Sequence, residues 1–588
     1  MGYLPTDPAN FASEAIDGFA AAYPRHVRRI DGGVMRLAPI PSGQVGVVVG
    51  GGSGHYPAFA GLVGRGLAAG AVCGNIFASP SAGQVVRVGS AVERGAGLLL
   101  TFGNYAGDVL HFTLGAERLR RQGIDVRIVT VTDDIASAPI DQQELRRGIA
   151  GGLAVYKVAG AAAEAGLPLD EVERLARKAN GRTRTLGVAF SGCTLPGAEQ
   201  PLFEVPSGRM AIGMGLHGEP GLSEGPLTEA GPLAALLVER LLAERPADVP
   251  EDQQRLVVLL NGLGCFKYEE LFVLFGAVNR ELQGRGVVMA DCECGELVTS
   301  LDMAGVSLSF FWLDGELEGF WNAAADSAAY RRGQLAAESD GPQPLATQRP
   351  EPELPSGPPT QTAAPLTPEQ EALLARFKAV EEELQERVEE LGGLDAVAGD
   401  GDHGLGMLRG IRGARESAIG ACGRGCGPGE VLMEAGEAWS DHGGGTSGAL
   451  WGGALLAAGQ SLAQATEIGP NDVDAAFGAA LQAVIDLGQA SPGDKTMLDA
   501  LQPFCLQLRA DLDEGLDLGQ ALQNAANTSL AAATATADLL PQLGRARPHG
   551  QRSLGHPDPG AMSMAYCLLA ASAGYVGLHG VADPAQAS

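Results

Sequence analysis

The chain has 588 residues, more than one hydrophobic core supports, and this length predicts about three or four structural units. Asp and Glu number 70 against 41 Lys and Arg, and the formal net charge of −29 argues against a nucleic-acid partner, because phosphate backbones need a basic surface. The sequence has no apolar run of about 18 residues and no secretory leader, and its nine cysteines are scattered, so we expect a cytoplasmic protein without a membrane segment.

Short apolar runs alternate with helical patterns through the first 338 residues. The runs that predict buried strands cover residues 45–49, 97–101, 126–131, 184–190, 256–260 and 287–290, and helical patterns cover residues 142–165 and 169–180. This alternation predicts an α/β module over residues 1–338 with mainly parallel sheets, divided into two lobes near residue 185. In such folds, ligands bind in loops at the C-terminal ends of strands.

The first glycine-rich segment, residues 50–57, directly follows the predicted strand 45–49. Glycines let a backbone approach a ligand closely, so Gly52, Ser53 and Gly54 are candidate binding residues. His55 at the end of the loop is a candidate base or hydrogen-bond partner. A histidine packed beneath a glycine turn is the structural alternative.

Two further segments of this kind follow along the chain, at residues 103–108 and 213–221. Asp108 is a candidate general base, although a helix cap explains an aspartate at this position equally well. His217 lies among glycines, and an imidazole exposed in such a turn can attack a carbonyl carbon. A purely structural turn remains the alternative for this third segment.

Residues 339–366 are rich in Pro, Gln, Glu and Ser and show neither a helical nor a strand period. This composition predicts an extended, semi-rigid linker. Beyond it, the segment 367–370 is a capping box with proline at the first helical position. Helical patterns then continue over residues 373–391, 430–439, 449–465, 472–488, 495–512, 519–540 and 561–577, and they predict an all-α barrel of about eight helices over residues 367–588.

Three carboxylates, Asp395, Asp400 and Asp402, lie among glycines near the start of this helical module. Oxygen ligands suit hard cations such as Mg²⁺, and a Mg²⁺ site that keeps open positions usually faces phosphate. The alternative is a loop in which acidic residues cap a helix. Taken alone, the acidic cluster fits both readings.

The glycine-rich segments resemble the substrate subunit of the dihydroxyacetone kinases. The matching segments are residues 50–55, 104–108, 192–197, 215–221, 261–264 and 299–305, in the family's order. The resemblance implies that His217 forms a covalent hemiaminal with the ketone of the substrate, that Asp108 is the base on the attacking hydroxyl, and that His55 hydrogen-bonds the substrate and assists proton transfer. It assigns the loop from Gly52 to His55, together with Gly103, to substrate binding. Gly103 stands where the family often has lysine, which places erythrulose beside dihydroxyacetone as a substrate.

Residues 367–577 resemble the nucleotide-binding subunit of the same kinases, and this resemblance decides the reading of the acidic cluster. It implies that Asp395, Asp400 and Asp402 hold two Mg²⁺ ions between the phosphates of ATP. The other positions implied to contact the nucleotide are His403, Gly404, Leu405, Gly406, Thr446, Ser447, Gly488, Met497, Arg545, Asp558, Pro559 and Gly560.

The two resemblances together predict a single-chain, ATP- and Mg²⁺-dependent kinase of a short ketose, with dihydroxyacetone as the first expectation, acting as a homodimer. Phosphoryl transfer in such an enzyme is mainly positioning and charge neutralisation. Three alternatives stand beside it: an erythrulose kinase, a side activity as an FAD–AMP lyase that forms a cyclic flavin phosphate, and a ketose sensor without catalysis.

Overall fold

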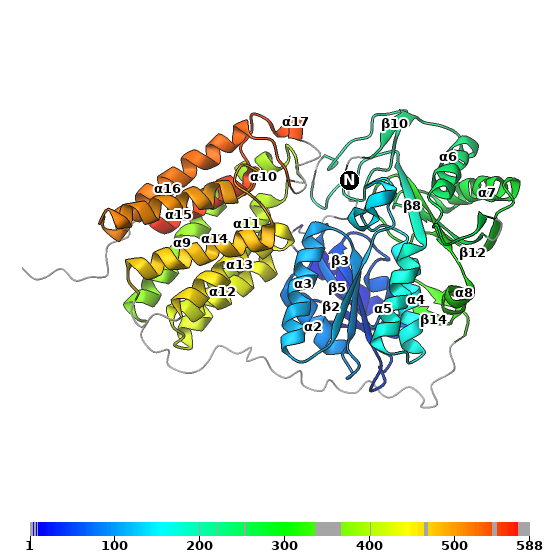
Figure 1. Cartoon of the computed structure of the whole chain (residues 1–588), viewed down its shortest axis with the longest axis horizontal. Coiled ribbons are helices and arrows are strands. Elements are labelled where there is room, and N and C mark those ends of the chain that lie inside the picture. Colours follow the sequence, from blue (N-terminus) through cyan, green and yellow to red (C-terminus); the bar gives the residue numbers. More distant parts are fainter. Residues whose placement is uncertain are drawn as a thin grey trace, which may run out of the picture.

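The computed structural model describes residues 4, 8, 10–198, 200–219, 221–251, 254–334, 366–399, 401–463, 468–543 and 550–573. An α/β part and an all-helical part lie side by side in it, as Figure 1 shows. The predicted fold class is therefore confirmed. The expected linker, apart from Leu366, lies outside the described residues, and the domain boundaries stay a prediction.

The first sheet of the α/β part has six strands in the order β1-β2-β5-β3-β6-β7. Their bounds are Val27–Ile30 (β1), Gly33–Arg36 (β2), Gly70–Ile76 (β5), Gly46–Ser53 (β3), Leu98–Gly103 (β6) and Val126–Val131 (β7). The last four run parallel, so their carboxyl ends share one edge. Helices α2 (Ala82–Val92) and α3 (Ala106–Arg121) cover one face, and α4 (Gly152–Glu164) and α5 (Leu169–Gly181) cover the other. Burial on both faces explains why these strands are nearly continuous apolar runs.

The second sheet also has six strands, in the order β10-β9-β8-β13-β11-β12. Their bounds are Ser223–Pro226 (β10), Arg209–Ile212 (β9), Thr183–Ala189 (β8), Gly305–Trp312 (β13), Arg255–Gly262 (β11) and Val288–Gly295 (β12). Only β11 and β12 pair in parallel, so the expectation of mainly parallel sheets is wrong here. The physical reason is that β13 returns between β8 and β11 in the opposite direction, which strand–helix alternation does not reveal. Helices α6 (Ala230–Ala243) and α7 (Tyr268–Gly284) pack on this sheet.

Smaller elements complete the α/β part. They are α1 (Phe11–Ala22), α8 (Gly315–Asn322), the 3₁₀ turns η1 (Ala60–Leu62) and η2 (Ile140–Leu145), and a three-stranded sheet of β4 (Gly64–Arg65), β14 (Ala325–Ser327) and β15 (Arg331–Arg332). The helix expected over residues 142–165 begins only at Gly152, and η2 stands in front of it.

The described residues from 366 to 573 form helices and no strand. The eight longer helices are α9 (Pro368–Glu386), α11 (His403–Gly423), α12 (Pro428–Gly443), α13 (Gly445–Leu462), α14 (Pro470–Gly488), α15 (Leu498–Asp513), α16 (Leu518–Ala535) and α18 (Pro559–Ser572). Two short ones, α10 (Val388–Asp395) and α17 (Gly550–Ser553), and the 3₁₀ turn η4 (Thr536–Asp538) lie between them. The predicted capping box is confirmed, because Thr367 Oγ1 accepts from the backbone of Gln370 and the Gln370 side chain accepts in return.

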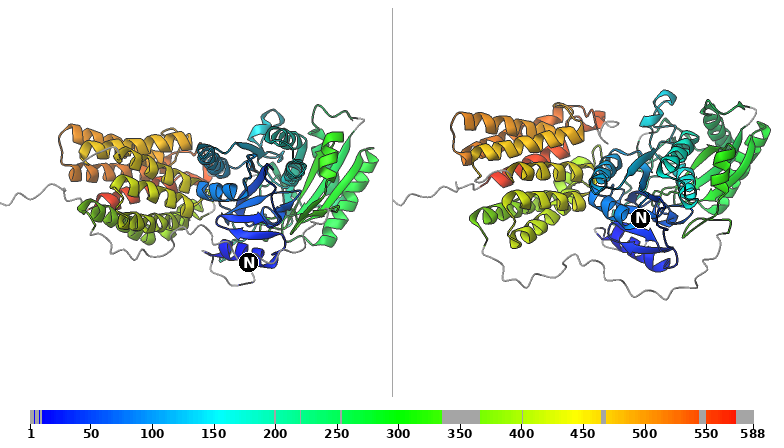
Figure 2. Two further views of the ribbon diagram at one scale, coloured as in Figure 1. Left: turned by 90° about the horizontal axis from the view of Figure 1, so that it is seen from below. Right: turned by 60° about the horizontal axis from the view of Figure 1, so that its bottom comes forward.

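The two parts meet where α12 and α13 pack against α2 and α3. Figure 2 shows this contact from two further directions, with the helical bundle beside the first sheet and the second sheet on the far side. The carboxyl edge of the parallel strands thus lies close to the loops that join the helices. Among the described residues, no helix is both long enough and apolar enough to cross a membrane.

Candidate active site

His217 lies in the turn that follows β9, and glycines shape this turn. Gly213 and Gly218 have φ angles of +79° and +85°, a left-handed conformation that favours glycine. The His217 Nδ1 atom lies 2.9 Å from Glu219 Oε1, and the His217 backbone N–H donates to Glu219 Oε2 over 2.9 Å. An ionised carboxylate only accepts, so Nδ1 carries the hydrogen. In the neutral form of this ring, Nε2 carries the lone pair that a nucleophile requires.

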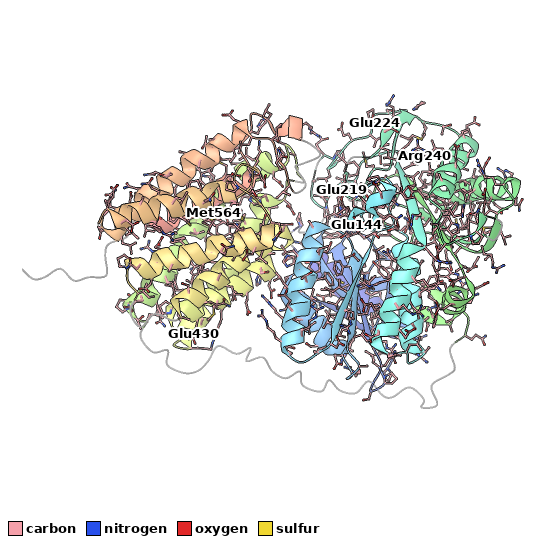
Figure 3. All side chains as sticks on the ribbon, viewed as in Figure 1. Glu144, Glu219, Glu224, Arg240, Glu430 and Met564 are labelled. Atoms are coloured by element: carbon pink, nitrogen blue, oxygen red, sulfur yellow. The ribbon has the colours of Figure 1, made fainter. Side chains whose placement is uncertain are left out.

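Glu219 is held as an anion. Burial favours its neutral form, but the neighbouring His217 and Arg147 outweigh burial and lower the pKa of Glu219 below its usual range. Arg147 Nη1 lies 3.9 Å from Glu219 Oε2, and its Nη2 lies 2.8 Å from Asp134 Oδ2. Glu219 lies on the side of the α/β part that faces the helical part, as Figure 3 shows. A negative charge beside Nδ1 stabilises a positive imidazolium.

His55 faces His217 from the loop after β3. Its Nδ1 atom lies 2.7 Å from the carbonyl oxygen of Thr299, which can only accept, so Nδ1 carries the hydrogen. The Nε2 atoms of the two histidines are 3.1 Å apart, and this contact is a hydrogen bond only when one of the two Nε2 atoms also carries a proton. Burial is the main reason that the pKa of His55 is lowered, to about 3. His55 therefore stays neutral near pH 7 and presents an accepting nitrogen.

Two aromatic rings stand against the His217 imidazole. Phe77 stacks on His55 with ring centroids 4.9 Å apart and meets His217 edge-on at 4.9 Å, while Tyr105 meets it edge-on at 5.2 Å. Such rings leave the imidazole little room to rotate and exclude water around it. A Cβ on Gly54 would lie 2.8 Å from the Phe77 ring, so a side chain at this position would displace Phe77.

Asp108 and Gly103 enter the same region from β6 and α3. Gly103 ends β6, and Asp108, which is 7% exposed, lies in the first turn of α3. A Cβ on Gly103 would lie 3.0 Å from Cε2 of Tyr105, so the tyrosine ring occupies the space beside this glycine. The Ser53 hydroxyl forms a hydrogen bond within the protein, donating to the carbonyl oxygen of Gly74 over 2.6 Å.

A cleft of about 1190 Å³ joins this region to the helical part. Of the residues expected to bind substrate, it is lined by Gly52, His55, Gly103, Asp108 and His217, and not by Ser53 or Gly54. From the helical part it is lined by residues 396–399, Gly445 and Thr446. The histidine pair and the loop of the acidic cluster therefore open onto one space.

The acidic cluster lies at the junction of α10 and α11. Asp395 is the last residue of α10, and Asp402 directly precedes α11. Burial, followed by the charge of Asp395, raises the pKa of Asp402, and burial raises the pKa of Asp558 to about 7, with Asp395 adding to it. Partly buried carboxylates that repel one another are relieved by a cation, so these residues fit a divalent metal ion. Asp400 lies outside the described residues, which contain no group of three side chains able to hold an ion.

Several of the predicted nucleotide positions converge around His403. Its Nε2 lies 2.9 Å from Ser563 Oγ, and its Nδ1 lies 3.4 Å from Ser447 Oγ. A Cβ on Gly404 would lie 2.2 Å from the carbonyl oxygen of Val388, so the first turn of α11 packs on α10 with no room for a side chain. Gly560 of α18 lies close to Met497, whose backbone N would be 3.6 Å from a Cβ there.

The remaining nucleotide positions are placed as follows. Thr446 lies in the first turn of α13 and Gly488 ends α14. Asp558 caps α18 by accepting from the backbone of Ala561 over 2.8 Å, and Pro559 is its first residue. Leu405 and Gly406 lie in the first turns of α11, with Leu405 51% exposed. Arg545 lies outside the described residues.

Sequence reasoning missed the residues that hold the histidine pair. Glu219 is two positions after His217 and was visible in the same segment, but nothing in the sequence pairs it with the imidazole. Arg147, Thr299, Phe77 and Tyr105 reach the site from other loops, and only the folded chain brings them together. In the helical part, Lys495 was missed; its ammonium donates to the carbonyl oxygens of residues 539, 553 and 556 and holds their loop.

Comparison with known proteins extends these observations over the whole chain. The Dak1 domain family matches residues 17–329, and the DAK2 domain family matches residues 397–573. An L-erythrulose kinase of Pectobacterium atrosepticum is 50% identical over 97% of this chain and 96% of its own, and a D-erythrulose kinase of Mycolicibacterium smegmatis is 50% identical over 96% and 97%. The crystal structure of the dihydroxyacetone kinase from C. freundii in complex with AMP-PNP and Mg²⁺ superposes with a TM-score of 0.52 and 30% identity, over 97% of this chain and 99% of that one.

The matches run through both parts of the molecule and include the loops that carry His55, Asp108, His217 and the acidic cluster. The chain thus carries a Dak1 and a DAK2 domain in one polypeptide and belongs to the dihydroxyacetone kinase family, whose members are phosphotransferases with an alcohol group as acceptor.

Proposed function

We propose that this protein is an ATP- and Mg²⁺-dependent kinase of a short ketose, and that its preferred substrate is the four-carbon ketose erythrulose. The observation that carries the proposal is the Nε2 atom of His217, which faces His55 at 3.1 Å and which Glu219 orients in a cleft shared with the loop of the acidic cluster. One side of the cleft can hold a carbonyl compound, and the other side can bring a phosphoryl donor.

The ketose half of the proposal rests on the two histidines and Glu219. The Nε2 lone pair of His217 attacks the carbonyl carbon, the π pair moves to the carbonyl oxygen, and this oxygen takes a proton from water. The imidazolium that forms lies beside the Glu219 anion, 2.9 Å from Nδ1. Glycerol has no carbonyl group and cannot be held in this way. The adduct fixes one end of the substrate, and the terminal hydroxyl of the substrate is thereby oriented before the reaction.

His55 and Asp108 supply the proton acceptors on this side of the cleft. A bond between His217 Nε2 and a ketose opens the 3.1 Å contact between the histidines and leaves His55 Nε2 to accept from a substrate hydroxyl. Asp108, 7% exposed at the start of α3, is the proposed base that takes the proton of the hydroxyl that is phosphorylated. A primary hydroxyl is a poor nucleophile until it loses this proton.

The nucleotide half rests on Asp395 and Asp402, with Asp400 as the proposed third carboxylate. The C. freundii relative was crystallised with AMP-PNP and Mg²⁺, and the partly buried, mutually repelling carboxylates here fit the same cation. When bound, Mg²⁺ neutralises the phosphate charge of ATP. The first residues of α13, Gly445 and Thr446, line the cleft, and the N-terminus of a helix suits an anion.

Erythrulose is favoured over dihydroxyacetone by the relatives and by Tyr105. Two relatives with 50% identity are named erythrulose kinases, one for each enantiomer. Within the described part of the chain, the buried Tyr105 hydroxyl has no hydrogen-bond partner, and burial raises the pKa of Tyr105 so that it stays a donor. The hydroxyl on the fourth carbon of erythrulose would accept a hydrogen bond from that donor.

The test is ADP release with ATP and Mg²⁺ in the presence of D-erythrulose, L-erythrulose, dihydroxyacetone or glycerol. We expect turnover of the ketoses, the highest kcat/KM for one erythrulose enantiomer, and no turnover of glycerol. No turnover of any ketose would refute the kinase. A higher kcat/KM for dihydroxyacetone than for either erythrulose would move the substrate assignment to the three-carbon sugar.

A further inference from the structure

Lys495 is a buried lysine in the loop between α14 and α15, where it is 5% exposed. Its Nζ atom donates to three backbone carbonyl oxygens, those of Leu539 over 3.1 Å, Ser553 over 2.7 Å and His556 over 2.9 Å. These three oxygens form a carbonyl cage around the ammonium group. A protonated amine has three hydrogens, and the carbonyl cage uses all of them.

The carbonyl cage suits a positive charge. A neutral amine has only two hydrogens and would leave one of the three carbonyl oxygens without a donor. Burial lowers the pKa of Lys495, and the carboxylates of Asp558 and Asp538 oppose this change. Backbone carbonyl groups replace the water around a potassium ion in ion channels, so such groups can surround a monovalent cation. The ammonium group of Lys495 therefore takes the place that such a cation would fill.

The carbonyl cage lies close to two of the predicted nucleotide positions. His556 lies two residues before Asp558, which caps α18, and Lys495 lies two residues before Met497, which directly precedes α15. A Cβ on Gly560 would lie 3.6 Å from the backbone N of Met497, so the starts of these two helices are neighbours. Lys495 therefore joins the two segments that carry these nucleotide positions.

The backbone around Lys495 supports the same arrangement. The backbone N–H of Gln542 donates to the carbonyl oxygen of Asp494 over 3.2 Å, and the backbone N–H of Asp558 donates to Thr536 Oγ1 over 2.8 Å. Lys495 has a φ angle of +62°, a left-handed conformation that residues other than glycine seldom adopt. Such a conformation persists where surrounding contacts outweigh its cost, and the three hydrogen bonds of Lys495 are contacts of this kind.

We propose that Lys495 is a positioning residue for the nucleotide, and that it determines the affinity for Mg·ATP and Mg·ADP by filling the carbonyl cage. The inference rests on the proposed kinase function. Lys495 acts through other residues, because all three of its hydrogens are used within the protein. Without the ammonium group, the three carbonyl oxygens lose their donor, and the segments of Asp558 and Met497 are no longer held together.

The substitution Lys495→Met tests this role, because methionine keeps an unbranched apolar stem and has no charge and no hydrogen to donate. Calorimetry with ADP and Mg²⁺ should give a Kd about tenfold or more above that of the wild type, and the KM for ATP should rise by a similar factor. The KM for the ketose should stay nearly unchanged, since the ketose binds in the α/β part. The matched control is Lys378→Met, on an exposed lysine of α9 that pairs with Glu382 at 3.5 Å, and its Kd for ADP should equal that of the wild type.

The substitution Lys495→Ala tests the carbonyl cage directly, because it leaves room for a small cation. Its Kd for ADP should also rise, and methylammonium chloride should lower this Kd again several-fold. Tetramethylammonium chloride at the same ionic strength has no hydrogen to donate and should leave the Kd unchanged. The carbonyl cage of the wild type is already filled, so the wild type should respond to neither salt.

The outcomes separate this proposal from the kinase itself. The positioning role is overturned if Lys495→Met binds ADP as tightly as the wild type, or if methylammonium does not tighten the binding of ADP to Lys495→Ala. It is also overturned if the variants lose the binding of erythrulose together with that of ADP, since the damage then extends beyond the nucleotide half. If the wild type itself binds no ADP in the presence of Mg²⁺, the proposed function fails first. Thermal unfolding shows that each variant is folded at the temperature of the assay, and Lys495→Ala with methylammonium carries the test if Lys495→Met is not folded.

Discussion

The substitution Glu219→Gln tests the orientation of His217 with almost no change in side-chain volume. Both carboxylate oxygens of Glu219 accept from His217, one from its backbone N–H and one from Nδ1, each over 2.9 Å. A glutamine amide has one accepting oxygen and one donating NH₂ group. One of the two hydrogen bonds is therefore replaced by two donors that face each other.

Either orientation of the amide damages the site. If the amide oxygen keeps the backbone N–H, the NH₂ group favours the tautomer with hydrogen on Nε2, and the nucleophilic lone pair is lost. If the oxygen keeps Nδ1, the turn around His217 loses its internal bond. A hydrogen bond to a charged group contributes about 1.5–3 kcal/mol, which corresponds to a loss of about 10- to 150-fold in kcat/KM.

The assay is ADP release over a range of ketose concentrations at saturating ATP and Mg²⁺. We expect the loss in kcat/KM for the ketose and an unchanged KM for ATP, since the substitution lies in the α/β part. Glu224→Gln is the matched control, because this exposed carboxylate of β10 lines the same cleft and pairs with Arg209 at 3.4 Å. A Glu219→Gln protein that is folded and as active as the wild type would refute the role of Glu219.

Three further predictions concern other parts of the site. Gly103→Ala places a Cβ about 3.0 Å from the Tyr105 ring, so the KM for erythrulose should rise several-fold with little change in the KM for ATP; an unchanged KM would contradict the role given to Tyr105. The pKa of His55 falls from 6.5 to about 3 on folding, so in acid the unfolded chain takes up a proton that the folded chain excludes. The contribution of neutral His55 to stability is therefore complete above about pH 6.5 and is lost as the pH falls toward 3. Denaturant titration from pH 7 to pH 5 should cost the wild type roughly 2 kcal/mol more than His55→Asn, and equal losses would argue against a buried neutral histidine. Asp402→Asn should abolish ADP release while the ketose still binds, which calorimetry measures; retained turnover would remove Asp402 from the metal site.

The parts of the fold that were predictable are those whose sequence signal is local. Residues 126–131 are rich in β-branched side chains, and the predicted strand has the bounds of β7. The strand β13 was missed, because its alternation of Ser with apolar residues does not stand out although all eight residues are buried. The helix expected from residue 142 begins ten residues later, where Gly151 and Gly152 interrupt the chain and Asp133 accepts from the backbone of Gly151 over 2.8 Å.

The histidine pair shows why the site itself was only partly predictable. His55 and His217 are 162 positions apart, and each was selected from its own glycine-rich segment together with a family resemblance. Their 3.1 Å contact, and the assignment of the hydrogen on each ring, depend on Thr299 and Glu219, which tertiary packing brings in. The hydrogen bond from Ser81 Oγ to Asp441, which joins the α/β part to the helical part, has no sequence signal at all, since the two residues are 360 positions apart.

The central claim is that the ketose is bound covalently through its carbonyl carbon to His217, and native mass spectrometry tests it most directly. Protein incubated with erythrulose without ATP should gain the full mass of the sugar, because addition of an imidazole nitrogen to a carbonyl expels no water. The His217→Ala variant should gain nothing, and peptide mapping of the wild type should place the added mass on the peptide that contains residue 217. An adduct that has lost one water, as an imine on a lysine would, or an adduct that persists in His217→Ala, would contradict the account.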